Sequence, residues 1–172
     1  KTLDQALDVY CADALRFTFA SASTGTEDAY FDENLCTRMV EKLYKEREWI
    51  LDKINNLKKG SYKRTECNMI DRIFENEIFI ICRDTIKAYE KYDYRAAVTS
   101  GFHILQGIRD FYQETLDSDM NPNMLILFIH VQLSLMYPII PHFCEYFLQL
   151  SLYNETILHT LKDCFCLLST NV

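Results

Sequence analysis

Apolar residues recur at steps of three and four along two long stretches of the chain, and this spacing limits what those stretches can form. The first stripe consists of Leu35, Met39, Leu43, Glu46, Ile50, Ile54 and Leu57, in which Glu46 is the charged exception. The second contains Ile70, Ile73, Phe74, Ile78, Ile81 and Ile86. Such steps place side chains on one face of an α-helix, whereas a strand requires alternation. Each stretch is therefore predicted to be a long helix with one buried face.

Glycine and proline are scarce, with four Gly and three Pro in 172 residues, too few for the frequent turns of an all-β protein. Thr2 and Gln5 are predicted to form a capping box, Gly60 to end a helix, and Asn121-Pro122 to begin one. Beyond that first helix, helices are expected over 12–22, 32–57, 68–91, 94–116, 122–137, 142–150 and 155–168. The predicted fold is all-α, an antiparallel bundle of four or five long helices preceded by a smaller helical segment.

Residues 120–144 contain no charged side chain, but polar residues and three prolines interrupt them. A membrane span needs about 20 mainly apolar residues, so a buried central helix is the better interpretation. Seven cysteines occur without a C-x-x-C pair, which argues against a zinc site. Most of them are expected to be small buried apolar residues in a reducing compartment, which points to the cytoplasm.

No pattern of residues indicates catalysis. The sequence has no glycine-rich phosphate loop, no H-E-x-x-H and no G-x-S-x-G. His130 lies in an apolar stretch and is expected to be a hydrogen-bonded core residue. His142 follows Pro141 and is expected to have a structural role at a helix start. We therefore assign no catalytic residue and no metal ligand.

The formal net charge is −7, yet positive charge is concentrated in one third of the chain. Residues 38–95 hold fourteen of the 18 Lys and Arg residues against eleven Asp and Glu residues. Cations at intervals of four can follow a phosphate backbone. The simpler interpretation is a solvated face on which cations pair with acids such as Glu41 and Glu90. Both interpretations stay open on composition alone.

Five blocks of sequence occur in a fixed order. Residues 12–16 read A-D-A-L-R, 27–31 E-D-A-Y-F, 71–77 D-R-I-F-E-N-E and 138–145 P-I-I-P-H-F-C-E, while 94–114 follow Y-x-x-A-x-x-x-G-x-x-x-x-Q-x-x-R-D-x-Y-x-E. The first block resembles the segment behind the ATP-binding loop of class I aminoacyl-tRNA synthetases. The other four are similar to leucyl-tRNA synthetases of the eukaryotic and archaeal type. The chain is thus identified as a member of that family, from its anticodon-binding helical region.

The resemblance implies a domain division and a set of structural positions. Residues 1–31 would end the helical segment that follows the ATP-binding loop, and 32–172 would form the anticodon-binding type of bundle. Asp13 and Arg16 would support the region behind that loop. The positions that match the family motifs are Asp13, Arg16, Asp71, Arg72, Arg109, His142 and Glu145.

The resemblance also implies a function. The whole synthetase would join leucine to tRNA(Leu) with ATP and magnesium, through a leucyl-adenylate. This fragment would lack the catalytic site and any cofactor, and would dock tRNA(Leu) as a monomer beside the remaining domains. Structured RNA offers phosphates and 2′-hydroxyls more readily than base edges. The expected contacts are Lys45, Lys58, Lys59, Lys63, Arg64, Arg83 and Lys87.

Two alternatives remain open. The first is a non-catalytic helical scaffold that binds another protein, for which the acidic ends and apolar helices are also typical. The second is the same helical domain from a class I synthetase specific for isoleucine, valine or methionine. The blocks at 27–31 and 71–77 argue against this second alternative.

Overall fold

The computed structural model describes residues 3–23 and 31–152. Their elements, in chain order, are α1 (Leu3–Leu7), α2 (Ala12–Ala22), α3 (Glu33–Lys58), α4 (Met69–Glu90), α5 (Tyr94–Val98), η1 (Thr99–Ile104), α6 (Leu105–Leu116), η2 (Asp117–Asp119), α7 (Pro122–Met136) and α8 (Pro141–Leu152). This part of the chain contains helices and no strand, so the all-α prediction is confirmed. The helix expected at 155–168 and the capping box at Thr2 lie outside the described residues.

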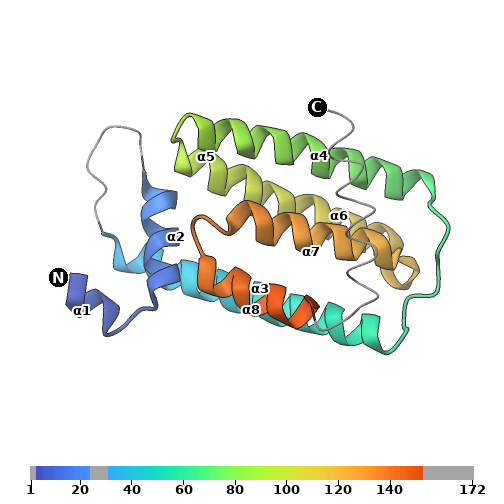
Figure 1. Cartoon of the computed structure of the whole chain (residues 1–172), viewed down its shortest axis with the longest axis horizontal. Helices are drawn as coiled ribbons and strands as arrows, with labels where there is room; N and C mark the ends of the chain where they lie inside the picture. The colour runs from blue at the N-terminus through green and yellow to red at the C-terminus, as the bar shows by residue number, and fades with distance from the viewer. Residues whose placement is uncertain (1–2, 24–30, 153–172) are drawn as a thin grey trace.

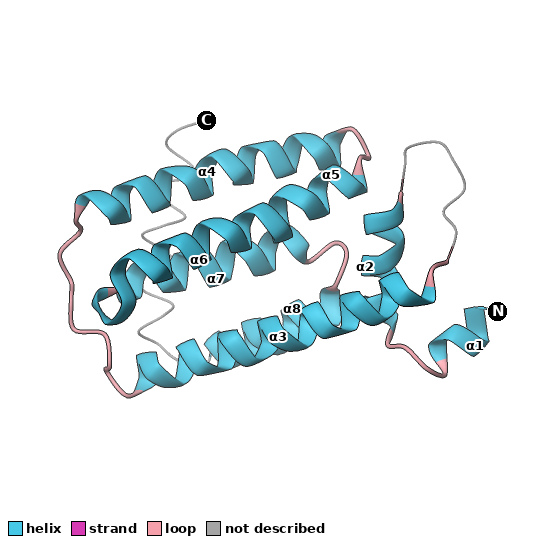
Figure 2. Ribbon diagram, turned by 180° about the vertical axis from the view of Figure 1, so that it is seen from behind, coloured by secondary structure: helices cyan, strands magenta, loops and turns pink. Residues whose placement is uncertain are grey.

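The long helices form an antiparallel bundle. Figure 1 shows α3 and α4 on opposite sides, with α6 and α7 between them and α8 alongside α3. A long loop joins α3 to α4 at one end of the bundle, and a tight turn joins α4 to α5 at the other. From behind, α6 lies in front of α7 (Figure 2). The short helix α2 packs against α3, α5 and α8 at the end nearest the N-terminus.

The predicted helix boundaries follow local backbone chemistry. Asn121 caps α7 by accepting a hydrogen bond from the Asn123 amide at 2.9 Å, and Pro122 occupies the first turn. Gly60 follows α3 with a φ of 65°, a backbone conformation that glycine adopts at little cost. Its amide donates to the Leu57 carbonyl at 3.0 Å. Both predicted boundaries are confirmed.

The helix expected at 94–116 is continuous but not uniform. Residues Thr99–Ile104 form a wider π-type turn between α5 and α6. Helix α4 packs closely against this turn at Gly101. A Cβ added to Gly101 would lie only 2.9 Å from Thr85 Cγ2 of α4. The hydroxyls of Thr85 and Ser100 are 2.8 Å apart, and Ser100 also donates to the Ala96 carbonyl at 2.9 Å. The wide turn therefore lies at a close contact between this helix and α4.

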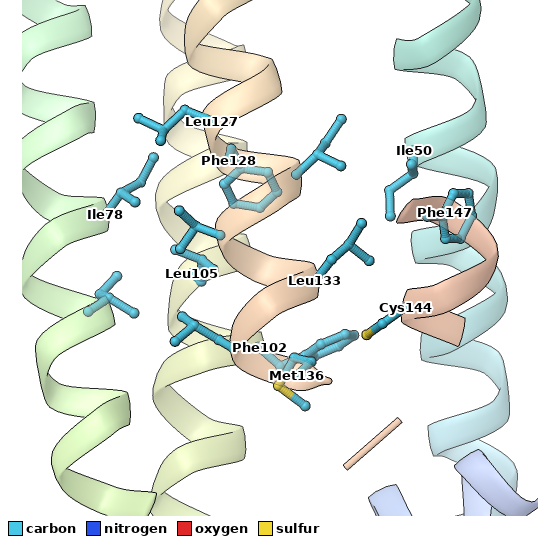
Figure 3. Packing of buried hydrophobic residues seen from close by; sticks show 14 of the residues in the cluster. Ile50, Ile78, Phe102, Leu105, Leu127, Phe128, Leu133, Met136, Cys144 and Phe147 are labelled. Carbon is cyan, nitrogen blue, oxygen red and sulfur yellow. The ribbon is translucent and has the colours of Figure 1, made fainter. Parts of the chain in front are cut away.

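Helix α7 is the centre of the core, as its apolar sequence predicts. Phe128 and Leu133 of α7 pack between Ile78 of α4, Leu105 of α6 and Ile50 of α3 (Figure 3). Cys144 and Phe147 of α8 complete the cluster and are fully buried. None of the described helices is long and apolar enough to cross a membrane.

The N-terminal segment shares this core. Phe17 of α2 is fully buried, and its ring lies 4.8 Å from that of Phe102 in an edge-to-face arrangement. A second, smaller cluster joins Ala6, Leu15 and Cys36. The division of the chain at residue 31 stays a prediction about domain boundaries.

The five described cysteines differ in burial: two are buried, Cys82 is half-buried and two are exposed. Cys36 and Cys144 are buried, as expected, and burial raises the pKa of Cys144 to about 12. Cys11 and Cys67 are exposed, so the expectation of burial is wrong for them. Both lie in connecting segments outside the apolar stripes, where the helical pattern makes no statement about burial. Residues 164 and 166 lie outside the described part.

His130 is a core residue, as predicted, but the expected hydrogen bond is absent at one nitrogen. Its Nε2 atom is buried without a partner, and so are both polar atoms of the Gln132 amide. A buried polar group without a partner costs about 1–3 kcal/mol. Burial lowers the pKa of His130 from 6.5 to about 4, because an imidazolium in this apolar setting would be poorly solvated.

We expect His130 to make stability depend on acidity. The folded state holds the imidazole neutral, so its contribution is complete above pH 6.5 and is lost as the pH falls toward 4. Between pH 7 and pH 5 the loss should be about 2 kcal/mol. Urea unfolding of the wild type and of His130→Gln at pH 7 and pH 5 measures this loss. The two proteins share all other titrating groups, so the difference between their pH dependences comes from His130. An identical pH dependence in the two proteins would contradict the prediction.

Candidate nucleic-acid interface

The loop between α3 and α4 carries the densest group of expected RNA contacts. Lys58 lies in the last turn of α3, and Lys59 and Lys63 follow it in the loop. All three side chains are exposed, and none forms an ion pair with a described residue. The loop between α3 and α4 lies at one end of the bundle, on the right of Figure 1. We call Lys58, Lys59 and Lys63 the loop lysines.

The remaining expected contacts lie elsewhere. Arg83 and Lys87 are exposed on the second half of α4, toward the opposite end of the bundle. At 1.5 Å per residue, Arg83 lies roughly 18 Å along α4 from Asp71 at its start. Arg83 also pairs with its neighbour Asp84 at 3.4 Å. Lys45 is exposed on the middle of α3. The structure therefore separates the seven expected contacts into distinct groups.

Arg64 differs from the other six because its guanidinium already bonds to several groups from other parts of the fold. Nη2 donates to Asp71 Oδ1 at 2.9 Å, and Nη1 makes a short bond to Asp71 Oδ2. Nε donates to the Asp119 carbonyl at 2.7 Å, and Nη1 also donates to the Glu66 carbonyl at 3.1 Å. The Arg64 side chain is 15% exposed and that of Asp71 is fully buried. Arg64 thus joins the loop to the start of α4 and to η2.

Asp71 is the centre of this network. Its carboxylate caps α4 together with Asn68, and Tyr112 of α6 donates its hydroxyl to Oδ1 at 2.5 Å. The same hydroxyl accepts the Asn121 amide at 3.0 Å, at the start of α7. Burial alone would raise the pKa of Asp71, but hydrogen bonds from Arg64, Tyr112 and Asn68 outweigh it and hold that pKa below its usual value. Burial, and then the bond to Asp71, raise the pKa of Tyr112.

A second buried ion pair explains the charged exception in the first apolar stripe. Glu46 of α3 is buried, and Arg109 Nη1 donates to its two carboxylate oxygens at 2.8 and 2.7 Å. Gln106 also donates to Glu46. The Arg109 guanidinium carbon lies 4.2 Å from the centre of the Trp49 ring, in a cation–π contact. The pair joins α3 to α6 in the interior.

A third contact joins the N-terminal segment to α8. The buried Asp13 carboxylate accepts the Phe143 amide at 2.8 Å and lies 2.9 Å from His142 Nδ1. Arg16 approaches Asp13 at 3.7 Å from an exposed position. Glu145 accepts a hydrogen bond from the Tyr137 hydroxyl at 2.8 Å, and Arg72 is exposed on the first turn of α4. Six of the seven motif positions thus make intramolecular contacts and Arg72 faces solvent.

Among the described residues, no group of three or more His, Cys, Asp and Glu side chains could hold a metal ion. His103 lies 3.4 Å from Lys42, and burial followed by that charge lowers the pKa of His103. Sequence reasoning missed the roles of Glu46, Trp49 and Tyr112. A single acid in register with an apolar helical stripe was the available signal for Glu46.

The sequence is similar to a known domain family and to several known proteins. Residues 71–164 match the family described as the anticodon-binding domain of tRNA ligase, which is more than half of the chain. A cytoplasmic leucine–tRNA ligase of Dictyostelium discoideum is 35% identical over 147 residues, or 84% of this chain. Those of Saccharomyces cerevisiae and Arabidopsis thaliana are 32% and 33% identical over 94% and 85% of it. The chain spans 13–14% of the length of these relatives.

Removing one partner of the Glu46–Arg109 pair should lower the free energy of unfolding strongly, whereas replacing both partners should lower it little. Arg109→Met leaves a buried carboxylate without its partner, which should lower the free energy of unfolding by about 3–5 kcal/mol. The double variant Glu46→Met/Arg109→Met fills the site with apolar side chains of similar volume, and should recover most of that loss. Urea unfolding measures both. Arg83→Met, at an exposed ion pair, is the matched control and should cost less than about 1 kcal/mol. A double variant no more stable than Arg109→Met would refute this.

Proposed function

Because this chain belongs to the anticodon-binding domain family of tRNA ligases, we propose that it docks transfer RNA within a leucine–tRNA ligase. The family match over residues 71–164 carries the proposal. The names of the relatives support leucine, since those reported above are all leucine–tRNA ligases and all are named cytoplasmic. We therefore propose tRNA(Leu) as the RNA, the other domains of the ligase as partners, and the cytoplasm as the location.

Chemistry belongs to other parts of the proposed ligase. Such an enzyme activates leucine with ATP and magnesium before transfer to tRNA. The sequence has no glycine-rich phosphate loop, and the described residues have no cluster of acidic ligands for magnesium. The described residues therefore do not fit ATP and its metal. The role left for them is to hold the RNA in a fixed position relative to the rest of the enzyme.

Docking would rely on phosphates more than on bases. The loop lysines are exposed, free of ion pairs with described residues, and mounted where α3 ends and α4 begins. Each can neutralise a phosphate and release a counterion, which favours binding at low salt. The net charge of −7 disfavours RNA on the rest of the surface, so the loop would also orient the RNA. Reading of the anticodon bases is not required by this arrangement.

The other cations would contact a different part of the RNA. Arg83 and Lys87 are separated from the loop by most of the length of α4. A folded RNA is large enough to contact both ends of a bundle whose longest helix, of 26 residues, is about 39 Å long. We propose that Arg83, Lys87 and Lys45 provide secondary contacts and the loop lysines the primary ones.

Removing two loop lysines should weaken tRNA binding. For Lys59→Ala/Lys63→Ala we expect a dissociation constant raised by about tenfold, and a plot of log affinity against log salt that is shallower by roughly 2. Filter binding of tRNA between about 50 and 200 mM salt measures both. Arg38→Ala/Arg47→Ala removes two exposed charges from α3 outside the loop, and should leave affinity within about twofold. Equal losses in the two variants would contradict docking at the loop.

The amino acid is tested on the longer protein that contains this chain. ATP–pyrophosphate exchange should be driven by leucine and not by isoleucine, valine or methionine. Exchange driven by one of the other three would keep the tRNA ligase family and overturn leucine. A folded protein without exchange for any of the four would overturn the ligase.

A further inference from the structure

The loop that carries Lys59 and Lys63 has little backbone support of its own. The amides of Lys59, Gly60 and Ser61 donate to the last turn of α3 at 3.0–3.1 Å. From residue 62 to residue 67, no backbone group bonds to the backbone of another described residue. Side chains must therefore hold this part of the loop in place.

Arg64 supplies most of the side-chain hydrogen bonds of this stretch, while Tyr62 packs against the core and Cys67 accepts a weak bond from the Asn121 side chain. Arg64 lies at the middle of the unsupported stretch and bonds to Asp71, to the Asp119 carbonyl and to the Glu66 carbonyl. The last of these bonds closes the loop on itself, and the first two fix it to α4 and η2. A planar guanidinium with five N–H donors can satisfy all three directions at once, which an ammonium cannot.

Arg64 is poorly placed to bind RNA directly. Turning its guanidinium toward a phosphate would leave the Asp71 carboxylate, which is fully buried, without its counter-charge. The Tyr112 hydroxyl and the Asn121 amide would lose their fixed acceptor geometry as well, because both depend on the position of Asp71. The network therefore favours an inward-facing Arg64 whether or not RNA is present.

We propose that Arg64 is a positioning residue, which fixes the loop so that Lys59 and Lys63 face the RNA backbone. The inference rests on the proposed docking function and deepens it. Tyr112 contributes from the interior: its ring stacks on Phe74 with ring centres 4.2 Å apart, and its hydroxyl holds Asp71 in line with Arg64. Tyr112 is buried and cannot touch RNA. A residue of α6 thus acts on RNA affinity through two intervening side chains.

The discriminating variant is Arg64→Lys, which keeps the charge and removes the planar fork. A direct phosphate contact would largely survive this change, because lysine binds phosphate as a point charge. A positioning role would not. We expect tRNA affinity to fall at least fivefold. We also expect loop exchange, measured as hydrogen exchange of the Asn68 amide at the end of the loop, to speed up at least tenfold, because this amide donates to Asp71 Oδ2 at 2.8 Å. Arg38→Lys, at an exposed arginine of α3 outside the loop, is the matched control and should change neither quantity by more than about twofold.

A double-mutant cycle separates the two roles further. In the Lys59→Ala/Lys63→Ala background, Arg64→Lys should cause no additional loss of affinity, because the groups that it positions are gone. Tyr112→Phe, a near-isosteric change that leaves every surface charge in place, is the second variant. It should shift loop exchange and affinity in the same direction as Arg64→Lys by a smaller amount, with the bundle still folded by circular dichroism.

The outcomes distinguish this inference from the function on which it rests. Loop exchange and affinity unchanged in Arg64→Lys, or a loss that adds fully to that of the lysine variant, overturns the positioning role and leaves docking intact. A wild-type chain that does not bind tRNA at low salt overturns both. Non-additive loss together with faster loop exchange supports both.

Discussion

Helix α7 is apolar and buried over most of its surface, and the arrangement of the other helices follows from the need to cover it. Such a helix is stable in water only if neighbours surround it. Helices α3, α4, α6 and α8 do so, and each turns its own apolar stripe inward. Their polar faces are thereby directed to solvent, which places Lys45 on the outside of α3 and Arg83 on the outside of α4. The distribution of surface charge is thus a consequence of how the centre is covered.

Two buried carboxylates fix the register of the surrounding helices. Glu46 of α3 pairs with Arg109, and Asp71 of α4 bonds to Tyr112. Arg109 and Tyr112 are three residues apart on α6, so they lie on one face of that helix. A sliding or rotation of α6 would leave both acids without partners at once. Apolar packing tolerates small shifts, whereas buried ionic contacts of this kind favour a single arrangement.

Local features could be predicted from the sequence, and long-range ones could not. Asn121-Pro122 and Gly60 mark helix boundaries through chemistry within a few residues, and the stripes on α3 and α4 reveal a helical period. The partner of Glu46 is 63 residues away, and nothing in a helical stripe identifies it. Arg64 is an arginine in a basic loop, a residue type typical of RNA contacts. Only its bond to the buried Asp71, seen in the structure, shows that the Arg64 side chain faces inward. The wide turn at Thr99–Ile104 packs closely against Thr85, a contact that no local pattern encodes.

The π-type turn also constrains how many residues this part of the helix can contain. An α-helix turns by about 100° for each residue, so a wide turn that accommodates one extra residue changes the phase of everything after it. Deleting one residue between Thr99 and Ile104 would give a more regular helix, yet Arg109 and Tyr112 would then point away from Glu46 and Asp71. Lineages that keep both acids buried should therefore keep the length of this segment invariant, even where its side chains drift.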